Sequence, residues 1–355
     1  MTAINANLIE PGDARWRGFL DRVPHDAYHL PQYVVCAARH EGGTPAAFYA
    51  EAGGCEFLAP LLIRPLPACL DAPVDWRDAA SPYGYPGPLA SDPGDRDGVT
   101  QFLRALRDVG RAHGIVSAFF RLHPLLALPP EALATCGRVR QDGQVVVMDL
   151  SRPPEELWSQ LRPNHRSGIN KLARAGFTAV MDDWDRYGDF VRLYRRTMER
   201  VTAADFYFFS DAYFDDLRCA LGDRLHLCSI VAPQGEVAAA ALFFATGDIV
   251  QYHLGATADA FLSHAPSKLI FDFVRRWGAA EGRKVLNLGG GVGGQADSLF
   301  HFKAGFSPLR AEFATFRMIL DEARYQMLIG RSPGVAAAAS GYFPAYRQPR
   351  GESRA

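Results

Sequence analysis

A lysine stands in an apolar and aromatic segment near the end of the 355-residue chain. Residues 297–306 read DSLFHFKAGF, and their alternation predicts a strand with Lys303 and His301 on one face and Phe302 on the other. An ammonium group is costly to bury unless it is paired or used. Two interpretations stay open here: a lysine at a sheet edge that extends its head group to water, or a functional cation that stabilises a developing oxyanion.

A cluster of basic residues occupies residues 161–176, LRPNHRSGINKLARAG. Arg162, Asn164 and Arg166 lie at its start, and the two arginines share a helical face if the helix continues through Pro163. Guanidinium groups bind phosphate through two parallel hydrogen bonds, so a phosphate clamp is one hypothesis. The other is a solvated helix that binds no ligand.

A third group of polar residues lies between positions 249 and 268. Tyr252 and His253 fall in the middle of a predicted strand, and Lys268 falls in the first turn of the helix that follows. In acetyltransferases that use coenzyme A, glycine amides at this turn cradle the pyrophosphate. The turn here reads SHAPSKL without a glycine, so that cradle is predicted to be absent. His253 or His301 could act as a base that keeps an amine deprotonated.

A glycine-rich run, KVLNLGGGVGG at residues 284–294, resembles the first motif of Rossmann-type methyltransferases. A nucleotide-binding strand normally opens its domain and is followed by a helix. Asp297 follows the glycines almost at once, and too little chain remains to build a doubly wound sheet. The alternative is a loop that brings the backbone close to a neighbour or ligand, with Asn287 as a candidate substrate-binding residue at its base.

The composition bounds the classes of partner. The formal net charge is -1, so no overall field draws the chain to DNA or to a membrane, and a polyanion such as tRNA must meet a local basic patch. Six scattered cysteines without CxxC argue against a metal site and against a disulfide framework. The N-terminus lacks the pattern of a signal peptide, and no apolar stretch approaches the ~20 residues that span a bilayer. We therefore predict a cytoplasmic protein and leave room for peripheral membrane contact.

The elements that must hold these residues follow a repeated order of helices and strands. A hairpin is predicted at Gly53 and Gly54, and a long helix at residues 266–281. Hairpins followed by a strand–helix–strand unit predict an α/β fold with a mixed sheet flanked by helices, in two tandem domains. We place these domains at residues 1–150 and 151–330. Residues 331–355, rich in Ala, Gly, Pro and Arg, are expected to form a flexible tail.

Taken in order, these motifs resemble the Fem-like proteins of the GNAT-like acetyltransferase superfamily, which include aminoacyltransferases that build peptidoglycan bridges. The resemblance rests on LRPNHRSGINKLARAG, YHLGAT, APSKLIFDFVRRWGAAEG, LNLGGGVGG and DSLFHFKAGF within residues 151–320, and more loosely on SPYGYPGPL and AFFRLHP in the first half. It implies two tandem GNAT-like domains. It also implies the transfer of an acyl or aminoacyl group onto an amine.

The resemblance further implies roles for individual residues. Phe302 and Lys303 fall on the aromatic–lysine pair of the family's reaction centre, Arg166 and its neighbours on binders of acceptor phosphate, and Tyr252 on the acceptor pocket. The candidate catalytic residues are thus Lys303, Phe302 and His253, and the candidate substrate-binding residues are Arg162, Asn164, Arg166, Tyr252, Lys268, Tyr83, Tyr85, Arg121 and Asn287.

No cofactor is implied, and two donors stay open. The order of the motifs and the missing coenzyme A cradle favour aminoacyl-tRNA as donor, with an amine of a cell-wall precursor, an amino sugar or a small metabolite as acceptor. The chain lacks a long helical-hairpin insertion and a basic surface, which leaves an acyl-CoA-dependent N- or O-acyltransferase of polysaccharide or natural-product biosynthesis as the alternative. A non-catalytic binding protein on the same fold is the third hypothesis.

Overall fold

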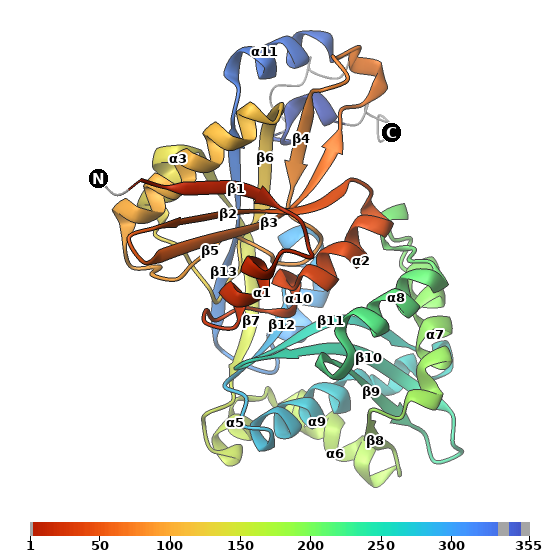
Figure 1. Ribbon diagram of the computed structural model, residues 1–355. Coiled ribbons are helices and arrows are strands. Elements are labelled where there is room, and N and C mark those ends of the chain that lie inside the picture. The colour runs from red at the N-terminus through yellow and green to blue at the C-terminus, as the bar shows by residue number, and fades with distance from the viewer. Residues whose placement is uncertain (1–2, 333–340, 349–355) are drawn as a thin grey trace. The chain divides into compact units, whose positions relative to one another are not determined.

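The computed structural model describes residues 3–332 and 341–348 of the chain (Figure 1). Two compact units divide it: unit 1 is Met1–Gln141 together with Phe313–Ala355, and unit 2 is Asp142–Glu312. The predicted division at residue 150 differs from this one, because the chain returns to unit 1 after completing unit 2.

Unit 1 is built on a mixed sheet with the strand order β1-β2-β3-β4-β6-β13. Neighbouring strands are antiparallel except for β4 and β6, which are parallel, and the two-residue strand β5 pairs with β3. The predicted hairpin at Gly53 and Gly54 is confirmed, since both glycines have positive φ between β2 and β3. The strands are β1 (Asn5–Ile9), β2 (Thr44–Ala52), β3 (Cys55–Pro65), β4 (Arg77–Ala80), β5 (Leu89–Ala90), β6 (Ile115–Arg121) and β13 (Arg310–Ile319).

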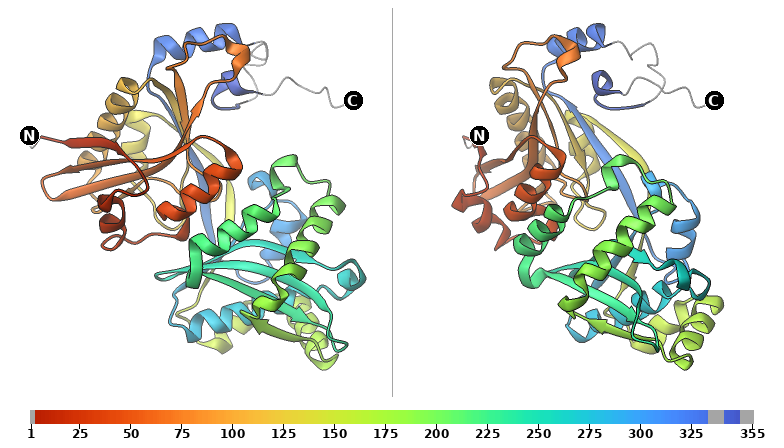
Figure 2. Two further views of the ribbon diagram at one scale, coloured as in Figure 1. Left: turned by 45° about the vertical axis from the view of Figure 1, so that its right-hand side comes forward. Right: turned by 90° about the vertical axis from the view of Figure 1, so that its right-hand side faces the viewer.

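Helices cover both faces of this sheet, as the views of Figures 1 and 2 agree. On one face α3 (Arg96–Ala112) buries Phe102, Leu103 and Leu106 against β-strand side chains such as Phe120. On the other face α1 (Ala14–Leu20) and α2 (Pro31–Glu41) contact β2 and β3. The unit also contains α4 (Pro130–Cys136) and α11 (Glu322–Arg331).

Unit 2 repeats this plan with the strand order β8-β9-β10-β11-β12-β7. Its neighbouring strands are antiparallel except for β11 and β12, which are parallel. Every residue of β10 is buried, which places this strand at the centre of the core. The strands are β7 (Arg138–Asp149), β8 (Thr178–Met181), β9 (Leu225–Val231), β10 (Val237–Thr246), β11 (Ile249–Thr257) and β12 (Val285–Gly289).

The helices of unit 2 also lie on both faces of its strands (Figure 2). On one face α9 (Ser267–Ala280) and α6 (Pro163–Arg174) bury Phe271, Val274 and Ile169 in a core with Phe306. On the other, α7 (Tyr187–Arg200) contacts β10 and β11, and α8 (Asp211–Leu221) packs its Phe214 against Phe190 of α7. The two short helices are α5 (Pro154–Gln160) and α10 (Ser298–Lys303).

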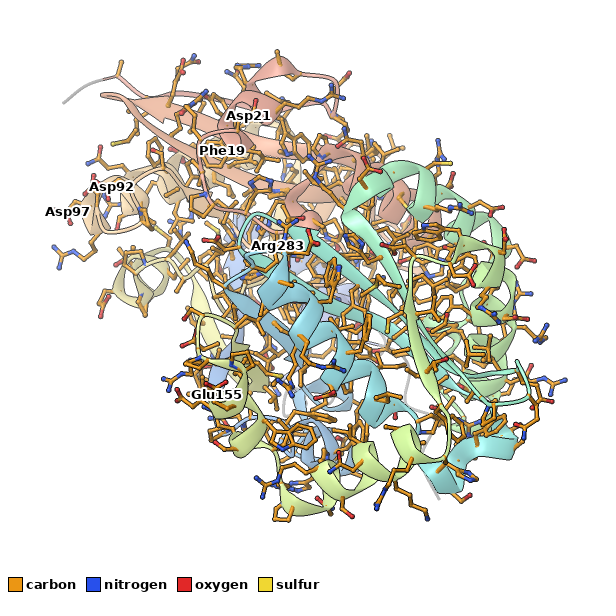
Figure 3. The ribbon with its side chains drawn as sticks, turned by 90° about the horizontal axis from the view of Figure 1, so that it is seen from below. Phe19, Asp21, Asp92, Asp97, Glu155 and Arg283 are labelled. Atoms are coloured by element: carbon orange, nitrogen blue, oxygen red, sulfur yellow. The ribbon has the colours of Figure 1, made fainter. Side chains whose placement is uncertain are left out.

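Acidic side chains mark the starts of helices in both units. Asp97 stands in the first turn of α3 and Glu155 in the first turn of α5, where the positive end of the helix dipole favours a carboxylate (Figure 3). The side chain of Asp95 also accepts a hydrogen bond of 2.9 Å from the Gly98 amide. These local signals explain why the helices begin where the sequence indicates.

Both units therefore share one topology, which confirms the prediction of an α/β fold with two tandem GNAT-like domains. Four antiparallel strands lead through a helix, α3 or α9, to a fifth strand parallel to the fourth. The sixth strand of each unit pairs with a strand far away in the sequence: β13 follows all the strands of unit 2 and pairs with β6 of unit 1, and β7 precedes the other strands of unit 2 and pairs with β12. This exchange of strands is why a single cut in the sequence cannot separate the units.

Two further expectations need correction. Residues 298–303 form the helix α10 and not the predicted strand, so Lys303 and His301 do not share a sheet face. Within the predicted tail, the described residues 341–348 are folded: the Tyr346 side chain is buried, and its hydroxyl lies 2.7 Å from Ser117 Oγ. The remainder of that prediction, residues 333–340 and 349–355, falls outside the described residues.

Candidate functional site

Lys303 lies at the end of α10 with only 5% of its surface exposed. The helix begins at Asp297, whose carboxylate accepts hydrogen bonds from the amides of Phe300 (2.8 Å) and Val292 (2.9 Å). One side chain therefore caps the helix and also fixes the glycine-rich loop before it. This cap holds the lysine and the loop in one arrangement.

Two groups of unit 2, the Gly290 carbonyl and the Tyr252 ring, lie next to the ammonium group of Lys303. Its Nζ donates a hydrogen bond of 2.7 Å to the Gly290 carbonyl oxygen and lies 5.1 Å from the centroid of the Tyr252 ring. Burial lowers the pKa of Lys303 to about 7, although the Asp297 carboxylate acts to raise it. At neutral pH the group is therefore divided between its charged and neutral forms, as proton transfer requires.

The carboxylate of Asp297 remains ionised beside this lysine. Burial acts to raise its pKa, but hydrogen bonds from the backbone of Phe300, Val292 and Leu299 and the charge of Lys303 outweigh burial and lower the pKa of Asp297. Asp297 thus supplies a fixed negative charge, while Lys303 is the group of this pair that titrates near neutrality.

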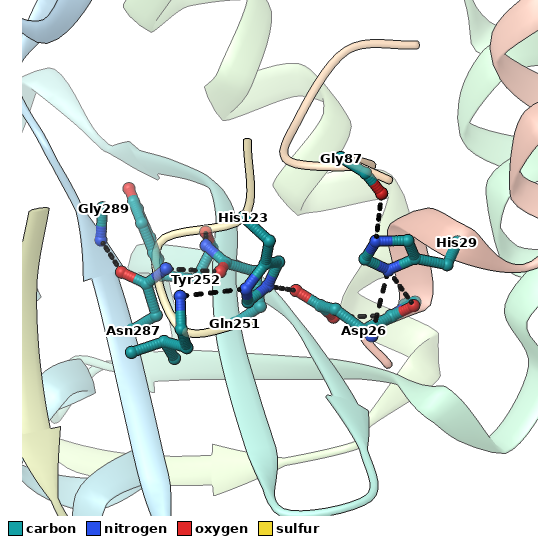
Figure 4. A network of polar contacts seen from close by, with 10 residues as sticks. Asp26, His29, Gly87, His123, Gln251, Tyr252, Asn287 and Gly289 are labelled. Carbon is teal, nitrogen blue, oxygen red and sulfur yellow. Dashed lines mark hydrogen bonds and ion pairs between the residues drawn. The ribbon is translucent and has the colours of Figure 1, made fainter. Parts of the chain in front are cut away.

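The glycine-rich loop rests on a buried chain of amides (Figure 4). Asn287 accepts a hydrogen bond of 2.9 Å from the Gly289 amide and donates one of 2.8 Å to Gln251, whose own side chain donates one of 2.7 Å to the Tyr252 carbonyl. Asn287 is fully buried, and both polar atoms of its side chain are engaged in these hydrogen bonds. Gly290 also lies close to the backbone of β7, since a Cβ on Gly290 would be 2.8 Å from the Gln144 carbonyl oxygen.

Tyr252 forms one wall of the lysine site. It lies on β11 and is half-buried, and its ring contacts Phe271 (5.1 Å between centroids) and Phe243 (5.5 Å). Burial raises the pKa of Tyr252 to about 12, so the phenol stays neutral. A Cβ on Gly255 would lie 2.3 Å from its hydroxyl oxygen, so the glycine of the YHLGAT motif leaves room for this side chain.

The start of α6 is attached to the end of α10. The Arg162 amide donates to the Gly305 carbonyl (2.8 Å), and the Arg162 guanidinium donates to the His301 carbonyl (3.2 Å). His165 Nε2 donates to the Phe302 carbonyl (2.9 Å), and a Cβ on Gly305 would lie 2.4 Å from the same ring. Arg162 and His165 thus hold the segment that carries Lys303.

Several cations gather around this attachment. Lys268 Nζ lies 3.4 Å from the Asn164 carbonyl oxygen, and Arg310 lies over the Phe300 ring, 5.4 Å from its centroid. Burial lowers the pKa of Arg310 and that of His165, and the charge of Arg162 adds to both effects. These groups influence one another electrostatically, and a bound anion would relieve their repulsion.

Three other predicted residues of unit 2, Arg166, His301 and His253, make no contact with Lys303 among the interactions described above. Arg166 makes a long contact of 3.5 Å to the Ser159 carbonyl, and His301 is exposed. His253 lies 3.2 Å from the Tyr213 hydroxyl of α8, on the face of β11 opposite to Tyr252. Burial lowers the pKa of His253 to about 3. The structure therefore separates His253 from Lys303, with which it was expected to act.

Tyr83, Tyr85 and Arg121 belong to unit 1. Tyr83 is fixed through its backbone, since its amide donates to Glu41 (2.7 Å) and its carbonyl accepts from the Tyr33 hydroxyl (2.9 Å). The Tyr85 ring lies 6.1 Å from the His123 ring. Arg121 donates to the Ser81 carbonyl (3.0 Å).

A buried network in unit 1 fixes the loop that contains these tyrosines (Figure 4). His123 Nε2 lies 3.1 Å from Asp26 Oδ2, and its Nδ1 accepts from the Leu125 amide. His29 Nδ1 accepts from the Asp26 amide, and its Nε2 donates to the Gly87 carbonyl at 3.1 Å. Both rings are satisfied by the protein, so this network is structural.

Sequence reasoning did not identify Asp297, Gly290, Gln251 or Arg310. Asp297 had a usable signal, because an aspartate three residues before an amide it can cap predicts a helix start at residue 298. The Gly290 carbonyl and the Gln251 amide act through tertiary contacts that no local pattern predicts.

Among the described residues, no group of three or more His, Cys, Asp or Glu side chains could hold a metal ion. None of the helices in residues 3–332 and 341–348 has the length and apolarity needed to cross a bilayer.

Residues 159–303, which carry nearly all of this site, match the family model of the acetyltransferase (GNAT) domain. No curated protein matches the chain in sequence. Among solved structures, FemX is similar with a TM-score of 0.69 and 14% identity, covering 91% of this chain and 99% of FemX. L-PGS from Bacillus licheniformis is similar with a TM-score of 0.54 and 14% identity, covering 91% of this chain and 97% of that one.

Proposed function

The chain contains a GNAT-type acetyltransferase domain and has the Fem-like fold that its motifs indicated, and from this premise we propose that it transfers an acyl or aminoacyl group onto an amine at Lys303. The observation that carries the proposal is a single buried lysine with a pKa of about 7, placed inside residues 159–303. A structural lysine gains nothing from such burial, whereas a proton carrier needs a pKa near the working pH.

In the proposed reaction a neutral amine attacks the carbonyl carbon of an ester or thioester donor. Neutral Lys303 accepts the proton that the amine nitrogen loses as the new C–N bond forms. The resulting ammonium group stabilises the oxyanion and then gives the proton to the oxygen or sulfur that leaves. The products are an amide and an alcohol or thiol, so no proton is left over and no external base is needed.

The residues around Lys303 would orient this step. The Gly290 carbonyl occupies one N–H of the ammonium group, and the Tyr252 ring lies to one side of it. Since both neighbours are held by packed elements, the lysine can act with little reorganisation. Phe302 contributes through its ring, which packs against Phe271, and through its carbonyl, which fixes His165.

We propose that the donor is aminoacyl-tRNA. We further propose that the reaction takes place in the cytoplasm and needs no cofactor. Arg162, Lys268 and Arg310 provide positive charge close to α10 that suits a phosphate-bearing donor. The start of α9 lacks glycine: Ala265 has a left-handed backbone (φ 49°), and Pro266 is the N-terminal cap residue. This absence of a glycine cradle is the observation against acyl-CoA, which remains the second candidate donor because the matched family model describes acetyltransferases.

Single-turnover assays with radiolabelled donors and a panel of amines would test the proposal. Lys303→Arg is the informative variant, because a guanidinium keeps its charge but does not release a proton. We expect Lys303→Arg and Lys303→Met to lose at least a hundredfold in rate, and the parent rate to rise as pH increases through about 7, where the lysine becomes neutral.

Retention of activity in Lys303→Arg, together with a parent rate that falls above pH 7, would mean that the lysine acts as a fixed cation. Full activity in Lys303→Met would refute the site altogether. Transfer from acyl-CoA but from no charged tRNA would reverse the choice of donor.

A further inference from the structure

Five arginines converge on one cavity in unit 1, which the acyl-transfer proposal does not use. The cavity has a volume of about 330 Å³. Its basic residues come from four strands and the C-terminal segment, and they are Arg64, Arg121, Arg140, Arg317 and Arg347. Residues this far apart in the sequence meet only through the fold, so no sequence motif predicted the cluster.

Acidic groups compensate for only part of this charge. Asp78, fully buried next to the cavity, pairs with both Arg64 (2.9 Å from Nε to Oδ1) and Arg347 (3.1 Å from Nη2 to Oδ1). Among the described residues that line the cavity, Glu41 is the one acidic residue, and burial raises its pKa despite the charges of Arg121 and Arg64. The arginines thus exceed these two carboxylates by three formal charges, and an anionic ligand would reduce their mutual repulsion.

Aromatic rings hold two of the guanidinium groups in place. The Arg121 guanidinium lies 5.3 Å from the centre of the Phe119 ring, and the Arg317 guanidinium lies 5.9 Å from that of Phe343. The two rings are stacked on each other, 6.4 Å apart with an interplanar angle of 28°. The result is a layered arrangement of arginine, ring, ring and arginine, in which the planar groups are arranged before any ligand enters.

The C-terminal segment closes one side of the cavity. The Gly341 carbonyl accepts hydrogen bonds from Arg317 (2.6 Å) and Arg140 (3.1 Å), and Arg347 is bound to Asp78. Tyr346 anchors the segment through its buried hydroxyl, 2.7 Å from Ser117 Oγ. Each of these contacts engages an N–H group of an arginine side chain, and a guanidinium carries five such donors.

We propose that this cavity binds the phosphate group of a small phosphorylated metabolite. Guanidinium groups match the geometry of phosphate oxygens, and the exposed Tyr342 side chain in the lining offers a flat surface to the remainder of the ligand. A volume of about 330 Å³ is at the small end for ligand sites, which favours a sugar phosphate or a mononucleotide over an RNA strand. The inference does not depend on acyl transfer, because its site contains none of the residues around Lys303.

Isothermal titration of the full chain would test this site, with glucose 1-phosphate and AMP as probes and glucose and adenosine as their controls without phosphate. We expect the phosphorylated probes to bind and the controls not to bind. Arg121→Gln and Arg317→Lys should each weaken binding about tenfold or more, the second because an ammonium cannot form the two parallel bonds. Arg104→Gln, at an exposed position of α3 outside the cavity, is the matched control and should leave the affinity unchanged.

Melting curves without ligand would show that each variant remains folded. The proposal is overturned if neither probe binds at millimolar concentration, or if the cavity variants bind as tightly as the parent. It is also overturned if a short RNA competes through the same arginines more strongly than either probe. The acyl-transfer assay is a separate readout, so loss of one function would not imply loss of the other.

Discussion

Replacement of Lys303 by methionine should stabilise unit 2 while it abolishes transfer. A lysine whose pKa falls from 10.5 to about 7 on folding opposes folding by about 4 kcal/mol at pH 7, since each tenfold change in proton affinity corresponds to about 1.4 kcal/mol. Methionine has a similar length and no charge to bury. The variant also loses the hydrogen bond to Gly290 and the contact with Tyr252, which together offset about 1–2 kcal/mol. The net gain at pH 7 should be about 2 kcal/mol.

The dependence on pH gives this prediction its sign. Because the pKa of Lys303 is lower in the folded state, the unfolded chain binds more protons between about pH 7 and pH 10.5, and the parent gains stability as pH rises through that range. The opposition from the lysine falls from about 5 kcal/mol at pH 6 to about 2 kcal/mol at pH 9. The advantage of Lys303→Met should therefore be larger by about 2–3 kcal/mol at pH 6 than at pH 9.

Hydrogen–deuterium exchange of peptides from β10 would measure this difference, because every residue of that strand is buried and exchange there reports unfolding of unit 2. Comparison of variant and parent at the same pH cancels the intrinsic effect of pH on exchange. Lys171→Met, at an exposed position of α6, is the matched control and should show no gain. If Lys303→Met is no more stable than the parent at pH 6, or if its advantage does not change with pH, the burial argument is wrong.

Three further predictions concern the surroundings of the lysine. Gly255→Ala should displace the Tyr252 ring and raise the KM for the acceptor at least threefold, whereas Gly188→Ala, where a Cβ meets nothing within 4 Å, should leave KM unchanged. His253→Gln should keep the parent's rate and its pH profile within a factor of two, because the histidine lies on the opposite face of β11; a shifted profile would contradict this geometry. Asp297→Ala should lower the stability of unit 2 by about 1 kcal/mol in urea titrations and slow transfer, while Asp297→Asn, which can still cap α10, should recover most of the stability.

Local patterns predicted most helices and strands but misplaced the segment that carries Lys303. In DSLFHFKAGF the aromatic residues alternate as in a strand, yet Asp297 caps a helix, and the short α10 buries Lys303 through its last turn. Here a capping hydrogen bond of 2.8 Å and the attachment to α6 outweigh the apparent alternation. The order of motifs still placed the lysine next to the glycine-rich loop, because that relation depends on sequence neighbours.

Long-range pairing accounts for the other differences. The return of β13 to unit 1 depends on hydrogen bonds to β6, and the folding of residues 341–348 depends on a contact between Tyr346 and Ser117. Neither partner is near in sequence, so composition alone predicted a flexible tail. The same reason explains why Arg121 was found as a candidate through a motif, whereas the four other arginines of the cavity were not.

The two proposals assign different tasks to the lysine in unit 2 and to the arginines in unit 1, and the chemistry of the two side chains suits this division. A guanidinium stays charged even when it is crowded with others, so a cluster of arginines can hold an anion but cannot carry a proton at neutral pH. A single ammonium group that is 5% exposed responds to burial by losing its proton, so it can carry one but is a poor permanent clamp. Exchange of the two residue types should therefore impair function in both directions: Lys303→Arg keeps its charge and loses the transfer activity, and Arg317→Lys keeps its charge and binds the phosphorylated probe about tenfold or more weakly.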